Sequence, residues 1–266
     1  MSVYINDNVN YLYDAIESIY YLQIKKPDQV VIVCDGIILD GHQKVLNYWK
    51  NRFPTIFKIV NLPTNLGLPS ALNFGITFCE YDYVARMDAD DISACDRFYH
   101  QINYLDNNQD VTIVGSNVYE FTNNIKNIVN HKHVPIDPDL ISRYIKFRNP
   151  LNHMSVIFKK DDVLKVGGYP LIQGYEDYFL WVKLYKNGYK IRNINLFLVY
   201  ARIENNFLAR RSGMKYFQNE IILQINFYVL KLFGFRIFLF NIFFRSFLRL
   251  IPRSFLQIVY KFLRRD

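Results

Sequence analysis

The sequence has few cysteines, and its first residues lack the pattern of a secretion signal. The three cysteines, Cys34, Cys79 and Cys95, are odd in number and do not have the spacing of metal ligands. They argue against a disulfide framework and fit a reducing compartment. No positively charged segment followed by an apolar one opens the chain, so we expect no signal peptide.

Excess positive charge is scarce over most of the chain and concentrated at its end. Residues 214–266 carry nine Lys and Arg against two acids, and this segment accounts for nearly all of the formal net charge of +8. The 266 residues are enough for one α/β domain with an appendage. We therefore divide the chain into a near-neutral body over 1–213 and a basic tail over 214–266.

The first 200 residues alternate short β-rich runs with helical patterns, which is typical of an α/β sheet with crossover helices. Apolar residues at helical spacing predict an early helix, and a second helix after residues 65–67 is predicted to be capped by Ser70. Strands are predicted at 29–34, 57–62, 81–87, 111–114 and 154–158.

The first strand is unusually short. Met1 to Tyr4 is already β-like, so the strand is reduced to its last turn. Either the sheet tolerates a short strand or the true start lies further upstream, and the sequence leaves both open.

Acidic residues follow two predicted strands directly. Asp35 ends one of them, and Asp88, Asp90 and Asp91 follow another. Ligands of such sheets lie beyond the carboxyl ends of the strands, so we expect these acids to face one crevice. Like charges this close repel unless something positive compensates them. Extended-chain spacing predicts that Asp88 and Asp90 share one side of the backbone and that Asp91 points elsewhere. An acidic turn that leads to a helix cap near Ser93 is the alternative.

Several short motifs follow one another along residues 1–213. They are Ser2-Val3-Tyr4, Val33-Cys34-Asp35-Gly36, Asn65-Leu66-Gly67-Leu68, Ala71-Leu72-Asn73, Ala85-Arg86-Met87-Asp88-Ala89-Asp90-Asp91, Arg148-Asn149-Pro150-Leu151-Asn152-His153, Gly167-Gly168-Tyr169 and Tyr175-Glu176-Asp177-Tyr178 before Trp181. Each motif alone is common. The ordered set resembles the family 2 glycosyltransferases with the GT-A fold, and more narrowly the bacterial enzymes that build O-antigen and exopolysaccharide repeat units, such as those for amylovoran.

The resemblance implies a sugar-nucleotide donor, for which UDP is the commonest nucleotide. A divalent cation, Mn²⁺ or Mg²⁺, stabilises the departing diphosphate as a Lewis acid and prefers oxygen ligands. The resemblance makes Asp90 the closest metal ligand, with Asp88 sharing the metal or facing the ribose. Asp91 is left to position the loop or to face the acceptor sugar.

The resemblance also implies donor-binding residues. Asp35 is expected to hydrogen-bond the nucleobase with Tyr4 beside the ring, and Asn73 is expected in the donor site. Simple strand packing is the alternative for Tyr4. Cys34 stands where the family often has another acid.

Three arginines follow the last strand of the body. Arg202, and Arg210 with Arg211, lie in a segment that closes over the donor in relatives, so they are candidate pyrophosphate contacts. A solvated basic face is the alternative for each of them.

Inversion at the anomeric carbon needs a base that takes the proton of the attacking hydroxyl. Glu176 and Asp177 precede an amphipathic run, so they lie at a helix N-terminus, where the helix dipole favours acids. By the resemblance, Asp177 is the base and Glu176 orients the acceptor or the loop. A pair of capping acids is the alternative. His153 has no partner at metal-ligand spacing, so we expect it to hydrogen-bond a substrate or to be structural.

The tail is rich in Phe, Leu and Ile. Its longest uncharged piece, 237–244, is too short to span a bilayer, and Gly234 and Pro252 divide the tail into short helices. Arg245, Arg249 and Arg253 form one basic stripe, which favours a helix lying in an anionic membrane surface. Packing on the catalytic domain and oligomerisation are alternatives. Nucleic-acid binding is disfavoured because the aromatic residues lie among aliphatic ones.

The sequence therefore predicts an inverting, metal-dependent hexosyltransferase at the cytoplasmic face of the bacterial inner membrane. It is expected to move glucose or galactose from a UDP-sugar onto an undecaprenyl-diphosphate-linked saccharide and to form a β-linkage. One alternative is a sugar nucleotidyltransferase, although residues 2–10 lack its Gly-rich, basic phosphate loop. The other is a non-catalytic, membrane-associated scaffold derived from such an enzyme.

Overall fold

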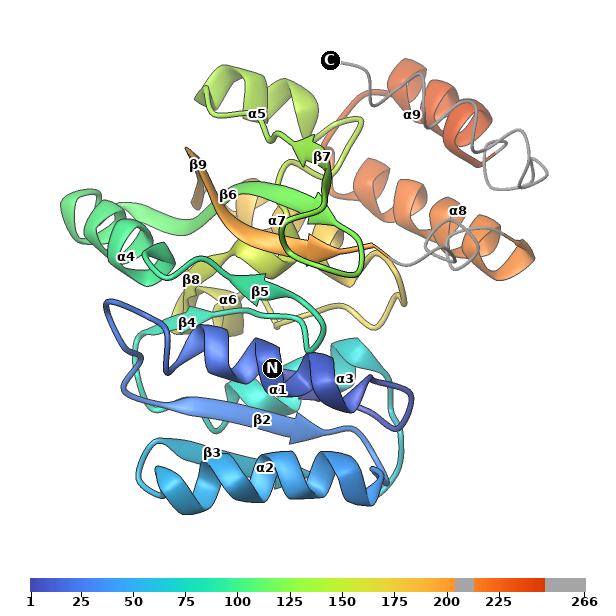
Figure 1. The fold of residues 1–266 in the computed structure, drawn as a ribbon. Coiled ribbons are helices and arrows are strands. Elements are labelled where there is room, and N and C mark those ends of the chain that lie inside the picture. Colours follow the sequence, from blue (N-terminus) through green and yellow to red (C-terminus); the bar gives the residue numbers. More distant parts are fainter. Residues whose placement is uncertain (204–212, 247–266) are drawn as a thin grey trace.

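A computed structural model describes residues 1–203 and 213–246 (Figure 1). The strands in this part of the chain form two sheets. Their bounds are β1 Ser2–Val3, β2 Val30–Cys34, β3 Phe57–Asn61, β4 Tyr83–Ala85, β5 Ile92–Ser93, β6 Val111–Phe121, β7 Ile128–Lys132, β8 Ile157–Lys159 and β9 Lys190–Arg202.

The smaller sheet is parallel and the larger one is mixed. The smaller sheet has the order β1-β2-β3. The larger sheet has the order β4-β8-β6-β9-β5, with β7 paired to β6. In the larger sheet β6 and β9 are parallel, and the other pairs are antiparallel.

Helices flank both sheets (Figure 1). Their bounds are α1 Val9–Ile19, α2 Asp40–Arg52, α3 Leu68–Ile76, α4 Arg97–Asn107, α5 Pro138–Tyr144, α6 Lys160–Lys165, α7 Glu176–Lys186, α8 Met214–Val229 and α9 Phe235–Asn241, with a 3₁₀ turn at His153–Ser155 and a π-helical turn at Ile242–Ser246.

The side chains of β2 alternate between two helix layers, as a strand buried on both faces requires. Ile32 packs with Ile16 of α1 and Leu46 of α2, whereas Val33 packs with Ala71 of α3. A Cβ atom at Gly75 of α3 would lie 2.8 Å from the Val33 side chain, so glycine allows α3 to approach the strand closely. The smaller sheet is thus covered by helices on both faces.

The first half of the tail shares a hydrophobic cluster with α7. Leu223 and Phe227 of α8 pack with Leu180 of α7 and Phe158 of β8. The Phe227 ring also meets the ring of Tyr178 edge-on, with 4.9 Å between the ring centroids. A boundary at residue 213 therefore divides residues that belong to one core.

One prediction for the tail is wrong. Arg245 was expected in a basic stripe on a membrane surface, but its guanidinium Nε lies 2.6 Å from a carboxylate oxygen of Glu220, which is fully buried. The other two members of the stripe, Arg249 and Arg253, lie outside the described residues, as does Pro252. Gly234 does separate two helices, as predicted.

Most predicted elements are confirmed, with shifted ends. The early helix and the strands after residues 29, 57 and 111 are present. Ser70 does not cap α3, because the helix begins at Leu68 and Gly67 is its N-cap. The strand predicted at 154–158 starts only at Ile157, because the preceding residues form a 3₁₀ turn.

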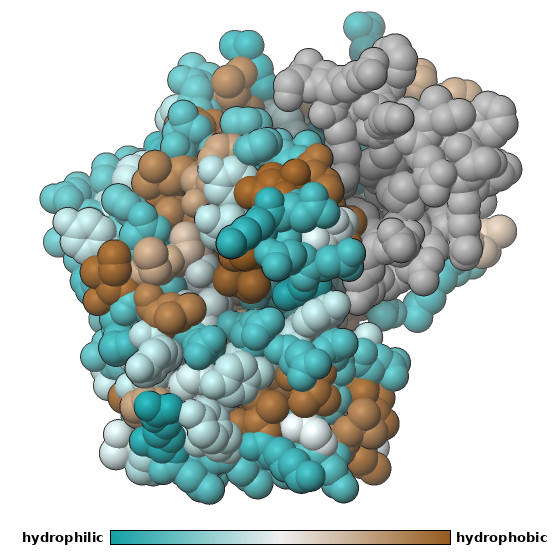
Figure 2. Space-filling view, viewed as in Figure 1, coloured by the Kyte–Doolittle hydropathy of each residue, from teal (hydrophilic) through white to brown (hydrophobic). Residues whose placement is uncertain are grey.

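The surface is mixed in character. On the face shown in Figure 2, hydrophobic residues form several separate groups among hydrophilic ones. Exposed apolar residues are ordinary in folded domains, because polar residues cannot cover the whole surface. Among the described helices, none combines the length and the apolar character that a bilayer crossing requires.

Candidate active site

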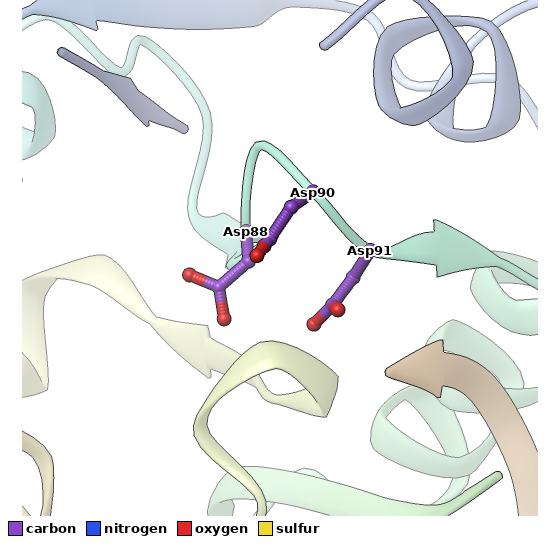
Figure 3. Close-up of side chains that lie close together, drawn as sticks. All are labelled: Asp88, Asp90 and Asp91. Carbon is purple, nitrogen blue, oxygen red and sulfur yellow. The ribbon is translucent and has the colours of Figure 1, made fainter. Parts of the chain in front are cut away.

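Three carboxylates come together directly after β4. Asp88, Asp90 and Asp91 each offer an oxygen, and these oxygens lie within 4.8 Å of one another (Figure 3). The backbone bends at residues 89 and 90, so the alternation of an extended chain does not continue through the cluster. For this reason Asp91 lies with the other two acids, and the expectation that it points elsewhere is wrong.

Burial and mutual repulsion raise the pKa values of two acids in the cluster. Burial, followed by the charges of Asp88 and Asp7, raises the pKa of Asp90 to about 7. Burial, followed by the charges of Asp88 and Asp90, raises the pKa of Asp91 well above its ordinary value. The buried Oδ2 atom of Asp91 has no hydrogen-bond partner among the described residues. Clustered, partly buried oxygen ligands of this kind fit a divalent cation such as Mn²⁺ or Mg²⁺.

Arg86 supplies one positive charge next to the acids. Its Nη2 atom forms an ion pair with Oδ1 of Asp88, and its side chain is 4% exposed. Its Nε and Nη1 atoms are buried without a hydrogen-bond partner in the described part of the chain. One arginine cannot balance the charge of three ionised carboxylates, which fits the binding of a cation by the cluster. The sequence placed Arg86 within a motif but gave no sign of this role.

Arg202 contacts the loop that carries the three acids. Its guanidinium carbon lies 3.7 Å from the ring centroid of Tyr11 and 4.6 Å from that of Phe121. Its Nε donates to the carbonyl of Asp90 at 3.0 Å, and its main-chain N–H donates to Oδ1 of Asp91 at 2.8 Å. The structure therefore gives Arg202 a role in holding the loop, which differs from the predicted pyrophosphate contact. Arg210 and Arg211 lie outside the described residues.

The second acidic pair opens α7, as predicted. Oδ2 of Asp177 accepts a hydrogen bond from the side chain of Asn149 at 2.7 Å, and Oδ1 accepts one from the N–H of Tyr178 at 2.6 Å. These contacts fix the carboxylate of Asp177 in one orientation. Asn149 lies in a sequence motif, but no local signal in the sequence links it to Asp177.

Glu176 has a different environment from Asp177. It is 7% exposed, and its Oε2 accepts the N–H of Gly174 at 2.6 Å. Burial, followed by the charge of Asp177, raises the pKa of Glu176 to about 7. Glu176 therefore holds a proton to a higher pH than an ordinary glutamate does.

Tyr169 lies between the two acidic groups. Burial raises the pKa of its hydroxyl, and the charges of Asp177, Glu176 and Asp88 act in the same direction. The hydroxyl lies 3.1 Å from Nε2 of His153. Burial and the charge of Arg86 lower the pKa of His153 well below its ordinary value, so the ring is neutral. The sequence placed Tyr169 within a motif but did not indicate these contacts, because its partners are distant in the chain.

Two of the predicted donor-binding residues, Asp35 and Asn73, form hydrogen bonds with main-chain groups. The carboxylate oxygens of Asp35 accept the N–H groups of Leu66 at 2.7 Å and Gly67 at 2.9 Å, which fixes the turn before α3. The side-chain amide of Asn73 donates to the carbonyl of Tyr169 at 2.8 Å and accepts its N–H at 2.7 Å. Asn73 thus positions the segment that carries Tyr169.

The loop after β1 lies near the acidic cluster. The N–H of Tyr4 donates to a carboxylate oxygen of Asp7 at 2.9 Å. Asp7 contributes to the raised pKa of Asp90, so this loop borders the cluster. The acids after β4, the pair that opens α7 and the loop after β1 therefore frame one site.

Comparison with known proteins assigns the chain to a family. Glycosyl transferase family 2 matches residues 2–163. An uncharacterised glycosyltransferase of Haemophilus influenzae is 37% identical over 266 residues, which cover 100% of this chain and 98% of that protein. A UDP-Gal:α-D-GlcNAc-diphosphoundecaprenol β-1,3-galactosyltransferase of Escherichia coli is 39% identical over 263 residues, which cover 98% and 94% of the two chains.

Solved structures share the fold. The mannosyltransferase PcManGT of Pyrobaculum calidifontis, in complex with GDP-Man and Mn²⁺, superimposes with a TM-score of 0.62 at 17% identity over 85% of this chain and 62% of that chain. Residues 1–349 of Staphylococcus aureus TarS, in complex with UDP-GlcNAc, give a TM-score of 0.63 at 19% identity over 84% and 65%. The expected GT-A fold is confirmed. On the family match and the two close relatives, the chain belongs to glycosyl transferase family 2.

Proposed function

We propose that this chain is an inverting glycosyltransferase that moves a hexose from a UDP-sugar to a lipid-linked, diphosphate-bearing saccharide and forms a β-linkage. The observation that carries the proposal is the cluster of Asp88, Asp90 and Asp91, together with Asp177, whose charge acts on the same buried Tyr169 as that of Asp88. The name of the E. coli relative supports galactose as the sugar and a diphosphoundecaprenol-linked acceptor.

The acidic cluster would hold Mn²⁺ or Mg²⁺ through Asp90 and Asp88, with the buried Oδ2 of Asp91 as a further candidate ligand. When bound, such an ion supplies Lewis-acid stabilisation to the departing diphosphate. Arg86 keeps Asp88 in place through its ion pair. Arg202 keeps the loop in place by binding the carbonyl of Asp90.

Asp177 would remove the proton from the attacking hydroxyl of the acceptor. The side chain of Asn149 and the N–H of Tyr178 hold its carboxylate in place, so little reorganisation is needed as the proton transfers. Glu176, which is buried beside it, would orient the acceptor or the loop.

The donor nucleotide would lie against the loop after β1 and the turn after β2. In this proposal Asp35 hydrogen-bonds the base through the carboxylate that also fixes the turn, and Tyr4 lies beside the ring. Asn73 acts on the donor site indirectly, through its two hydrogen bonds to the main chain of Tyr169.

The tail would contact the cytoplasmic surface of the bacterial inner membrane. Large apolar side chains of α8, α9 and the π-helical turn are exposed, with Val229 at 70%, Phe235 at 57% and Phe243 at 69%. Lys231 and Arg236 lie among them in the sequence. Apolar residues mixed with basic ones suit an anionic lipid surface.

The test is a donor panel with a defined acceptor. The purified chain is incubated with Mn²⁺, a GlcNAc-diphospho-lipid and UDP-galactose, UDP-glucose or UDP-GlcNAc, and the release of UDP and the mass of the product are measured. We expect UDP release only with acceptor present, and a product heavier by one hexose with a β-linkage.

Two outcomes would contradict the proposal. Pyrophosphate release from UTP and a sugar 1-phosphate would indicate a nucleotidyltransferase. The absence of UDP release with every donor, from a folded protein that binds UDP, would favour the non-catalytic scaffold.

A further inference from the structure

The loop after α5 leads directly to the residue that holds Asp177. Residues 145–148 follow the helix and end at Asn149, whose side chain donates to Oδ2 of Asp177 at 2.7 Å. In this loop the side chains of Phe147 and Arg148 are exposed. The loop therefore borders the position that the proposed function gives to the attacking hydroxyl of the acceptor.

Side chains from three other elements hold the main chain of this loop. The carbonyls of residues 145–147 each accept a hydrogen bond. In that order, the donors are the hydroxyl of Tyr178 at 2.7 Å, the side-chain amide of Asn241 at 2.9 Å and the guanidinium of Arg245. These donors belong to α7, α9 and the π-helical turn, so the loop is fixed between the helix that carries Asp177 and the tail.

Two positive side chains of the loop, those of Lys146 and Arg148, form no ion pair or hydrogen bond with another described residue. Basic side chains after a helix often bind its last carbonyl groups. Here those carbonyls have other donors. The carbonyl of Tyr144 accepts the N–H groups of Phe147 and Arg148, and the carbonyls of residues 145–147 accept the three side chains above. The two cations are therefore not needed to complete the end of α5.

The buried arginines Arg86 and Arg245 are already engaged with acids. Arg86 pairs with Asp88, and Arg245 pairs with Glu220. A diphosphate on the acceptor adds negative charge beside the acidic pair that opens α7, and like charges repel at short range. The diphosphate therefore needs positive side chains that are not paired within the protein, and the two cations of the loop meet this condition.

The exposed aromatic surface of the tail adjoins the loop. The ring centroids of Phe147 and Phe240 lie 6.3 Å apart, and those of Phe240 and Phe244 lie 4.5 Å apart. Phe240 and Phe244 are exposed, as is Phe147. In the proposed function this part of the tail contacts the membrane surface. The diphosphate joins the lipid to the sugar, so it would lie between this surface and Asp177, where the loop is.

We infer that Lys146 and Arg148 bind the diphosphate of the lipid-linked acceptor. The inference rests on the proposed function. With a GlcNAc-diphospho-lipid, the attacked hydroxyl and the diphosphate are substituents of one sugar ring, so the diphosphate lies one ring away from Asp177. A guanidinium group binds phosphate oxygens in a fixed geometry, and an ammonium group acts as a point charge. The loop thus selects acceptors that carry a diphosphate and holds the sugar next to Asp177.

The first test measures steady-state kinetics with a water-soluble, short-chain GlcNAc-diphosphate acceptor, Mn²⁺ and the UDP-sugar that supports transfer. We expect Arg148→Gln to raise the acceptor KM by about tenfold, because a charge-assisted contact is lost, while kcat and the KM for the UDP-sugar stay close to wild-type values. Lys146→Gln should act in the same direction, and Arg148→Lys should restore part of the loss.

The matched control is Lys44→Gln, which removes an exposed positive charge on α2 and should leave the acceptor KM unchanged. An unchanged acceptor KM in Arg148→Gln would overturn the inference. A fall in kcat alone would also overturn it, because the loop would then act only by positioning Asn149.

Binding without transfer separates this inference from the proposed function. The same acceptor is titrated by calorimetry into the wild type and Arg148→Gln with UDP and Mn²⁺ present, so that no sugar is transferred. We expect the variant to bind the acceptor about tenfold more weakly, and both proteins to bind the methyl glycoside of GlcNAc equally. Equal binding of the diphosphate acceptor by both proteins would contradict the inference, even where transfer by the wild type supports the proposed function. Arg148-dependent binding in a protein that transfers no sugar would refute only the proposed function.

A phospholipid headgroup is the other source of phosphate near this loop. Co-sedimentation of Arg148→Gln with vesicles that contain anionic lipid distinguishes the two sources. We expect the bound fraction to change little, because the exposed apolar side chains of the tail are proposed to make the membrane contact. A clear loss of vesicle binding together with an unchanged KM for the short-chain acceptor would assign the loop to the bilayer surface and overturn the inference.

Discussion

At the scale of single residues, the site depends on how charge is balanced. Three carboxylates lie together while one buried arginine pairs with Asp88. Asp177 lies at the start of α7 and accepts a hydrogen bond from Asn149. We therefore propose different tasks for the two acidic groups, with a cation bound by the first and a proton accepted by the second.

Replacing Asp177 with Asn tests the second task. The side chain keeps its size, and the hydrogen bond from the N–H of Tyr178 can remain, but the carboxylate base is lost. We expect UDP affinity in calorimetry to be unchanged and turnover to fall by about a hundredfold or more. Asp139→Asn, at an exposed position on α5, is the control. Normal turnover of the Asp177 variant would refute the base assignment.

The raised pKa of Glu176 makes stability depend on pH. Its pKa is about 7 in the folded chain and 4.5 ordinarily, so the folded state retains a proton that the unfolded state loses between these values. The contribution of Glu176 is present below pH 4.5 and is lost as pH rises through 7, with an upper limit of about 3 kcal/mol.

Urea unfolding of the wild type and Glu176→Gln at pH 5 and pH 8, with EDTA present, measures this effect. The variant cannot ionise at this position, so its free energy of unfolding should fall less between the two pH values. An identical fall in both proteins would show that Glu176 titrates normally in the folded chain.

At the scale of elements, α8 and the π-helical turn hold the loop that leads into α7. Glu220 of α8 pairs with Arg245 and accepts the hydroxyl of Tyr175 at 2.7 Å. Asn219 donates to the carbonyl of Gln173 at 3.0 Å. Because this loop ends at Glu176, the tail contributes to the position of Glu176 and Asp177.

Glu220→Ala should leave the buried charge of Arg245 unpaired and lower the free energy of unfolding by about 3–5 kcal/mol. The double variant Glu220→Leu with Arg245→Leu removes both charges, so it should be clearly more stable than Glu220→Ala in urea unfolding. If the single and the double variant were equally destabilised, the ion pair would not be the source of the effect.

The sequence predicted features that depend on local chemistry. It placed the three acids after the end of a strand, now β4, and Glu176 with Asp177 at the start of a helix, now α7. The orientation of Asp91 was not predictable, because it depends on a bend at residues 89 and 90. The contact of Arg245 with Glu220 was not predictable either. It joins the π-helical turn to α8, and the packing of the tail against α7 brings these two elements together.

At the scale of the whole molecule, the tail is both part of the core and a candidate membrane surface. Deleting residues 214–266 would remove Leu223 and Phe227 from the cluster shared with α7, so a truncation would not separate these two roles. Substitutions on the exposed side of the tail are the better test.

We expect the chain to co-sediment with vesicles that contain anionic lipid, and the bound fraction to fall several-fold in the double variant Val229→Glu with Phe243→Glu. Ile24→Glu, a change at a residue that is 69% exposed outside the tail, should have no effect. Binding should weaken as salt rises from about 0.1 M to about 1 M. Equal binding of the wild type and the double variant would place the membrane contact elsewhere.

The most direct test of the central claim is a calorimetric titration of UDP with and without Mn²⁺, using the wild type and Asp90→Ala. The account predicts that Mn²⁺ strengthens UDP binding to the wild type by roughly a hundredfold or more, and that Asp90→Ala loses most of this gain together with transfer activity. Undiminished metal-dependent binding in Asp90→Ala would contradict the assignment of the acidic cluster as the site of the metal and the diphosphate.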